Sequence, residues 1–98
     1  MHNARRPLVM VWHNPANGRW YKARLAYDLL DDLVIQTEWQ GPQRGGNRHT
    51  TVVGNYAEAF RHLRRLHQRR QQRGYRLISI RRADTWGVAP NPKVFIAQ

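Results

Sequence analysis

The chain has 98 residues, of which 41% are hydrophobic and 10% aromatic, so it can bury a modest core and is too apolar to be wholly disordered. Seventeen basic residues against six acidic ones give a formal net charge of +11, and the lack of cysteine excludes disulfides and cysteine zinc sites. No segment approaches the roughly 20 apolar residues of a membrane span, so we expect one cytoplasmic domain over residues 1–98.

The first part of the chain predicts a β-hairpin. An apolar run over 8–13 precedes Asn17-Gly18, a pair that readily takes the positive φ angles of a tight turn. The second arm, 19–29, alternates with a period of two. The side expected to face the core carries Tyr21, Ala23, Leu25, Tyr27 and Leu29, and the side expected to face solvent carries Lys22, Arg24 and Asp28.

Two more strands are expected after a turn at Asp31-Asp32. Residues 33–39 alternate again and end at Trp39, and 48–53 form a fourth strand. The glycine-rich loop between them lacks the Gly-Lys-Ser/Thr ending of a nucleotide-triphosphate cradle. The adjacent aspartates are explained by turn chemistry and are assigned no metal or catalytic role.

A helix is predicted over about 56–73, because apolar residues then recur every three or four positions. Asn55, with Glu58 three residues later, resembles a capping box, and Gly74 is a natural C-terminal stop. The apolar stripe of this helix comprises Ala59, Phe60, Leu63, Leu66 and His67.

A closing strand over 75–80 completes the predicted elements, followed from about residue 83 by an irregular C-terminal extension. The apolar residues 94–96 within that extension would add an edge strand or meet a partner. The predicted fold class is therefore α+β, with an antiparallel β-sheet of four to five strands packed against one long α-helix.

The arginines are concentrated in the second half of the chain, where nine occur between Ala59 and Ala83 without one acidic residue. Arg61, Arg65 and Arg69 share one ridge of the predicted helix, and like charges at this spacing repel one another. An anionic partner would offset that repulsion, and nucleic acid is the commonest such partner. A solvated charged face is the alternative interpretation of the same run.

The five histidines give little support for a metal site. His62 and His67 lie five residues apart on the predicted helix, so they cannot share a face as i, i+4 ligands do. We therefore predict no metal and no cofactor. His49, near many arginines, could move a proton in a small basic ribonuclease, although the sequence assigns it no partner carboxylate or second histidine.

The order of these parts resembles the WGR domain, which occurs beside the catalytic domain of DNA-dependent poly(ADP-ribose) polymerases and in many small bacterial proteins. The similar stretches are 19–25, 34–39 and 55–75, with Ala-Glu-Ala-Phe near the helix start and Gly-Tyr just after its end. Trp39 matches the tryptophan of the Trp-Gly-Arg signature. Gln40 and Gly41 follow it in place of Gly-Arg, so the signature arginine is missing and Arg44 or Arg48 would have to supply its charge.

The resemblance implies a non-enzymatic module that binds nucleic acid, double-stranded DNA in the first place, and that is nucleoid-associated if it binds DNA. Trp39 would lie at the contact edge, although its phase with Leu33 and Ile35 equally fits a buried residue. A protein-interaction module, acting as an accessory inhibitor on an acidic partner or as a homodimer through the C-terminal tail, is the alternative. The predicted nucleic-acid-binding residues are Trp39, Arg44, Arg48, Arg61, Arg64, Arg65, Arg69, Arg70 and Arg73.

Overall fold

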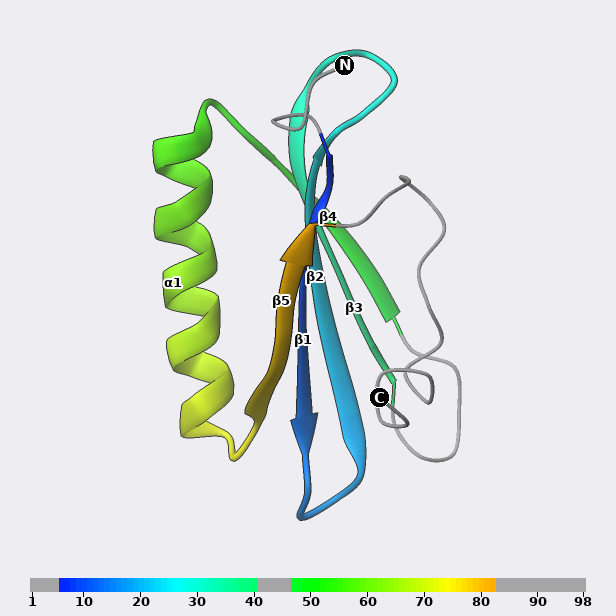
Figure 1. Cartoon of the computed structure of the whole chain (residues 1–98), viewed down its shortest axis with the longest axis vertical. Coiled ribbons are helices and arrows are strands. Elements are labelled where there is room, and N and C mark those ends of the chain that lie inside the picture. Colours follow the sequence, from blue (N-terminus) through cyan, green and yellow to red (C-terminus); the bar gives the residue numbers. More distant parts are fainter. Residues whose placement is uncertain (1–5, 41–46, 83–98) are drawn as a thin grey trace.

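The computed structural model describes residues 6–40 and 47–82, which form five strands and one helix (Figure 1). Every neighbouring pair of strands is antiparallel, and the strand order is β4-β3-β2-β1-β5. The predicted α+β class and the antiparallel sheet are confirmed. The elements in chain order are β1 (Leu8–Asn14), β2 (Arg19–Tyr27), β3 (Leu33–Gln40), β4 (Asn47–Val53), α1 (Tyr56–Gln72) and β5 (Arg76–Arg82).

The predicted hairpin between β1 and β2 is confirmed, and its turn is held by local hydrogen bonds. Gly18 has a φ of 74°, and its N–H donates to the carbonyl oxygen of Asn14 at 2.8 Å. The Asn17 side-chain oxygen accepts from the Arg19 N–H at 3.0 Å. These bonds place Arg19 at the start of β2, next to the tip of the hairpin.

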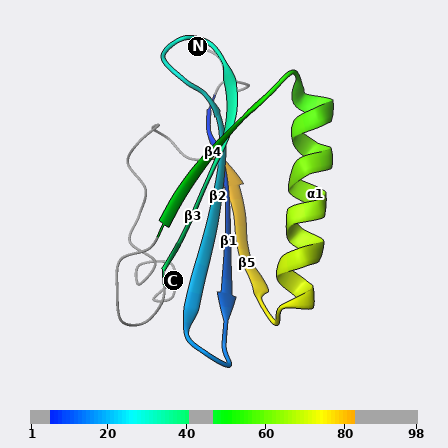
Figure 2. The ribbon, with the colours of Figure 1, turned by 180° about the vertical axis from the view of Figure 1, so that it is seen from behind.

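Helix α1 carries the chain from edge strand β4 to the opposite edge, where β5 pairs with β1, and it lies on one side of the sheet (Figures 1 and 2). At its start, the Asn55 side chain accepts from the Glu58 N–H at 2.8 Å, and the Glu58 carboxylate accepts from the Gly54 N–H at 2.9 Å. The predicted cap is therefore present, with the carboxylate reaching one residue further back than in the usual box.

The end of α1 also follows the prediction. Gly74 has a φ of 91°, its N–H donates to the Gln71 carbonyl at 3.0 Å, and the Tyr75 N–H donates to the Arg70 carbonyl at 2.9 Å. This pair of bonds is a Schellman motif, in which glycine tolerates the left-handed conformation. The motif turns the chain sharply, so that Tyr75 and β5 return beside β1.

The main core joins side chains from α1 and from one face of the sheet. Trp12 lies at its centre, fully buried, and its indole N–H donates to Nδ1 of His67 at 3.1 Å. His67 thus lies at the edge of the core with a protein hydrogen-bond partner. The buried members of this cluster are Met10, Trp12, Ala23, Leu25, Leu33, Ile35, Val53, Ala59, Leu63 and Leu66.

Three sequence expectations are wrong in detail. Strand β2 ends at Tyr27, because Asp28 starts a turn, and Leu29 is exposed instead of facing the core. Phe60 is also exposed, lying beside Tyr56 rather than in the core. Lys22, on the side of β2 that was expected to face solvent, is buried and retains only 8% of its accessible surface.

Candidate functional site

A polar cleft of about 480 Å³ lies where the β1–β2 hairpin and the C-terminal end of α1 meet the end of β3. Its volume falls within the roughly 300–1,000 Å³ typical of ligand-binding clefts. Every charged side chain among its described lining residues is an arginine. The lining residues are Asn14, Asn17, Arg19, Tyr21, Trp39, Arg70, Arg73 and Tyr75.

Aromatic rings form one wall of this cleft. Tyr21 and Trp39 are a cross-strand pair of β2 and β3, and their rings are nearly parallel, 6° apart, with centroids 5.8 Å from each other. Tyr75 meets Tyr21 edge-on at 6.2 Å. A close cross-strand pair keeps both rings on the face of the sheet that carries α1. The wall therefore offers ring surface, which binds bases and sugars without sequence preference.

Arg70 reaches from α1 onto this wall. Its guanidinium carbon lies 4.3 Å from the centroid of the Tyr21 ring and 5.2 Å from that of Tyr75. Its Nε atom is buried and has no hydrogen-bond partner within the described ranges 6–40 and 47–82. A cation held over two rings keeps its position and its charge, so Arg70 is preorganised to meet an anion that enters the cleft.

Arg73, at the end of α1, and Arg19, at the start of β2, add two positive charges to the cleft. The Asn14 side-chain amide donates to the Arg73 carbonyl oxygen at 3.1 Å, and the same side chain accepts from the Ala16 N–H at 2.9 Å. Asn14 thereby ties the end of the helix to the hairpin turn. The three arginines thus border one cleft, although Arg19 comes from the start of β2 and Arg70 and Arg73 come from the end of α1.

Of the nine predicted binding residues, the structure brings three, Trp39, Arg70 and Arg73, into this cleft. Arg48 pairs across the strands with Glu38, on the face of the sheet opposite α1, and Arg44 lies outside the described residues. The other four are exposed on α1 and do not line the cleft; they are Arg61, Arg64, Arg65 and Arg69.

Sequence reasoning missed Arg19, Tyr21 and Tyr75 as site residues. Tyr21 alternates in phase with the core residues of β2, so its pattern predicted burial alone. Tyr75 directly follows the glycine that ends α1, and a residue at that position packs back on the helix end. The signal that could have found both is their tyrosine identity, since a tyrosine commonly keeps one polar edge in water.

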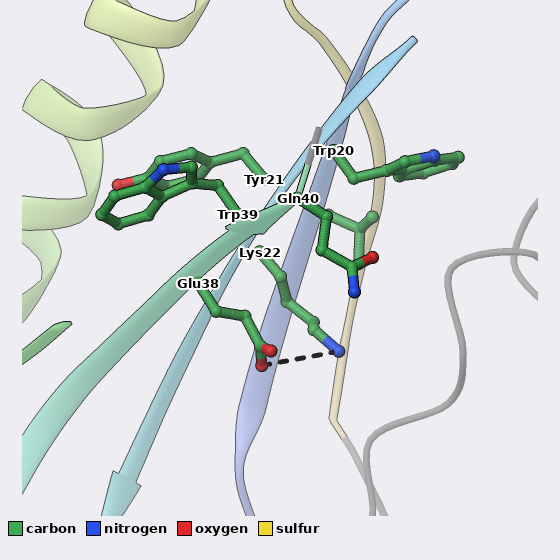
Figure 3. A pocket seen from close by; sticks show the side chains of 7 residues that line it. Trp20, Tyr21, Lys22, Glu38, Trp39 and Gln40 are labelled. Atoms are coloured by element: carbon green, nitrogen blue, oxygen red, sulfur yellow. Dashed lines mark ion pairs between the residues drawn. The ribbon is translucent and has the colours of Figure 1, made fainter. Parts of the chain in front are cut away.

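A second, smaller pocket lies on the other side of the same strand ends (Figure 3). Its volume is about 50 Å³, far below the roughly 150 Å³ of a protein cavity that binds benzene, so it is too small for a nucleobase. Figure 3 shows Tyr21 and Trp39 pointing to one side of the strands and Trp20 and Gln40 to the other. The larger cleft is therefore the candidate site.

Charged side chains beside this small pocket share one carboxylate. Lys22 Nζ lies 3.9 Å and an Arg24 guanidinium nitrogen 3.8 Å from the same Glu38 oxygen. Burial lowers the pKa of Lys22 from its ordinary value, and the positive charges of Arg24 and Arg48 add to the effect, while Glu38 opposes it. The group is a partly buried ion cluster in which cations outnumber the acid.

His62 on α1 and His49 on β4 lie within electrostatic reach of each other, although they are distant in sequence. Partial burial, followed by the charges of Arg65 and Arg69, lowers the pKa of His62, and the charge of His49 contributes in the same direction. His49 lies on β4, opposite Thr37, and its Nδ1 is 3.4 Å from the Thr51 hydroxyl. The sequence could not reveal this proximity, because it arises from the placement of α1 relative to β4.

Over the described ranges, no group of three or more histidine, cysteine, aspartate or glutamate side chains is placed to hold a metal ion. In the same ranges no helix combines the length and the apolar character needed to cross a membrane.

Comparisons with protein-family models, with curated proteins and with solved structures find no match to the chain.

Proposed function

We propose that this protein is a non-enzymatic nucleic-acid-binding module of the WGR-like type, with DNA as the favoured ligand. The observation that carries the proposal is the cleft in which Arg19, Arg70 and Arg73 surround a wall of aromatic rings. Guanidinium groups bind phosphate in two places, and ring faces stack on bases or sugars. The cleft thus offers both kinds of contact that a nucleic acid makes.

The charge of the whole chain supports the same proposal. The exposed arginines of α1 extend the positive surface beyond the cleft, and they would attract phosphates without reading sequence. In this arrangement the helix arginines guide and position the nucleic acid. Trp39 and Arg70 make the close contacts. Arg48, on the opposite face of the sheet, has no part in the cleft.

Duplex binding measured at several salt concentrations tests the proposal. Neutralising each phosphate contact releases counterions, so log K should fall linearly with log salt, with a slope of about −0.9 for each contact. Absence of binding at low salt, or an affinity indifferent to salt, would refute it. Comparing linear with circular DNA for Trp39→Ala and Arg65→Ala separates recognition of ends from general attraction to phosphates.

A matched pair of substitutions tests the place of binding. Arg73→Gln removes a charge at the cleft, and Arg61→Gln removes the same charge from exposed helix surface. Arg73→Gln should weaken binding about tenfold, as expected for one close charge-assisted contact, and Arg61→Gln by roughly twofold. Equal effects would move the proposed interface from the cleft to the helix.

One observation favours a ribonuclease as the second candidate. His62 lies within electrostatic reach of Arg65, Arg69, Glu58 and His49, and histidines beside arginines are side chains that acid–base cleavage of RNA can use. On this proposal the arginines hold the phosphate and the two imidazoles move protons. Purified protein should then cleave RNA, and His49→Ala and His62→Ala should each abolish cleavage. Intact RNA after prolonged incubation with the parent protein would eliminate this candidate.

A further inference from the structure

Two leucines at the tip of the β2–β3 hairpin are the most exposed large apolar side chains among the described residues. Leu29 is 96% and Leu30 82% accessible. Single exposed leucines are common on protein surfaces, but two adjacent ones at a loop tip form a compact apolar knob. The knob gains free energy when a partner surface covers it, because burial removes its apolar surface from water.

The tip is held in one conformation by its own hydrogen bonds. A single Asp28 carboxylate oxygen accepts from the N–H groups of Leu30 and Asp32, both at 2.9 Å. The Asp28 N–H donates to the Asp32 carbonyl at 2.9 Å, and Asp31 takes a φ of 64°. The two leucines are thus presented in an ordered loop, which lowers the entropy lost on docking.

The tip also carries the opposite charge to most of the molecule. Asp28, Asp31 and Asp32 are three of the six acidic residues in the chain. The cleft at the end of β3 has three arginines around tyrosine and tryptophan rings. Leucines flanked by aspartates are complementary to a polar cleft in which guanidinium groups border aromatic rings, chiefly in formal charge.

We propose that the Leu29–Leu30 tip of one copy of the protein docks in the arginine and aromatic cleft of a second copy. Tip and cleft lie at opposite ends of the sheet, so a chain cannot fill its own cleft (Figure 1). The contact is therefore head to tail, and repetition of such a contact yields open chains of molecules unless the rotation closes a ring. A knob of two side chains buries little surface, so the association is weak and sensitive to salt.

The docking does not depend on the proposed function, but its regulation does. If nucleic acid binds the cleft, it competes with the tip, and self-association and nucleic-acid binding exclude each other. At high concentration and without nucleic acid, the protein molecules would associate into chains, and the tip of one molecule would fill the cleft of the next. A nucleic acid that binds the cleft more tightly than the tip does would dissociate the chains and bind the separated molecules.

Sedimentation velocity over a range of protein concentrations, at low and at high salt, tests the proposal. The parent protein should associate at low salt, and high salt should weaken the association. Leu29→Ser with Leu30→Ser, a double change at fully exposed positions that spares the core, should weaken it at least tenfold, as expected from about 1.4 kcal/mol of lost burial. A protein that stays monomeric at low salt, or a double variant that associates like the parent, would overturn the proposal.

A charge exchange identifies the two surfaces. Asp32→Arg and Arg73→Asp should each abolish self-association, and an equimolar mixture of these two variants should recover pairs. In the mixture the unchanged tip of the Arg73→Asp protein meets the unchanged cleft of the Asp32→Arg protein, and the two exchanged charges attract each other at the reverse contact. Failure to recover pairs, or loss of association in Phe95→Ser but not in the tip variant, would assign the contact elsewhere. A short duplex added to the parent protein should dissociate the chains. If the duplex does not bind at all, the proposed function fails while the sedimentation results still decide the docking.

Discussion

The guanidinium carbon of Arg70 lies 4.3 Å from the centroid of the Tyr21 ring, and Tyr21 lies parallel to Trp39 on the neighbouring strand. One side chain of α1 therefore adjoins the pair of rings that walls the cleft. Replacing arginine with lysine keeps the charge but removes the planar group that lies over the ring. This substitution separates the contribution of the stacked guanidinium from that of its charge.

Arg70→Lys should lower the free energy of unfolding by about 0.5–1 kcal/mol, the usual value of a cation held over aromatic rings. Urea denaturation followed by tryptophan fluorescence measures this difference. Arg61→Lys is the matched control, because Arg61 is exposed on the same helix and should change stability by less than about 0.5 kcal/mol. Equal effects of the two substitutions would mean that the Arg70 contact adds nothing to stability.

The elements of this fold were predictable where local chemistry decides them. Asn17-Gly18, the Asn55 cap and Gly74 each marked an element boundary correctly, because turn and cap geometry depends on residues only a few positions apart. The end of β2 was predicted two residues too late. Alternation alone cannot show that the Asp28 carboxylate binds backbone N–H groups and turns the chain there.

The site was predictable only in part, since it depends on which face of the sheet each strand presents to α1. Trp39 and Arg70 are distant in sequence, and only the crossing of the helix brings them together. Arg48 lies closer to Trp39 in sequence, but the register with Glu38 puts it on the opposite face. Counting charges predicted a positive surface but could not divide the arginines between the two faces of the sheet.

The pKa of His62 is lowered from its ordinary value of 6.5, first by partial burial and then by Arg65 and Arg69. The folded protein thus binds this proton more weakly than the unfolded chain does. The free energy of unfolding should therefore fall as the pH drops from 6.5 through the lower native pKa, and should not respond to this group above that range.

His62→Gln removes this part of the pH dependence. Urea denaturation of both proteins from about pH 7.5 to about pH 5 should show a smaller loss of stability in the variant. His13→Gln is a suitable control on a different face of the sheet, against Trp20. If His62→Gln and the parent lose stability in parallel, other groups govern the acid sensitivity.

Burial of Lys22 destabilises its charged form, which lowers its pKa from the ordinary 10.5. At neutral pH the lysine is charged in both states, and only the folded state has the unfavourable free energy of burying that charge. This destabilisation decreases as the pH rises through the lowered native pKa toward 10.5. Lys22→Met should therefore leave the free energy of unfolding unchanged or raise it by up to about 1 kcal/mol. In that variant Glu38 would still have Arg24, which lies 3.8 Å from it in the parent protein.

Glu38→Gln gives the contrasting result, since it leaves the cations of this cluster without their carboxylate. The free energy of unfolding should fall by about 1 kcal/mol or more. Equilibrium urea unfolding at neutral pH compares the two variants directly. A Lys22→Met protein that is less stable than Glu38→Gln would show that the lysine contributes net stability.

Two glycines, Gly18 and Gly74, have left-handed backbone angles. Replacing each with alanine compares the effect of backbone strain with the effect of an added contact beside the cleft. An alanine at either position pays roughly 1–2 kcal/mol for its positive φ. A Cβ at Gly18 (φ 74°) meets nothing within 4 Å, whereas one at Gly74 (φ 91°) lies 3.4 Å from the Asn14 amide nitrogen. That amide donates to the Arg73 carbonyl and ties the helix end to the hairpin.

Gly74→Ala should therefore lower the free energy of unfolding at least as much as Gly18→Ala does. It should also weaken nucleic-acid binding more, because its added Cβ contacts Asn14, although both glycines adjoin residues that line the cleft. Urea denaturation measures the first difference, and duplex titration at low salt measures the second. Gly18→Ala, whose added Cβ meets nothing within 4 Å, measures the effect of backbone strain alone beside the same cleft. If both variants bind the duplex like the parent, the link from Asn14 to the helix end does not shape the cleft. If both lose binding equally, the strain itself disturbs this end of the molecule.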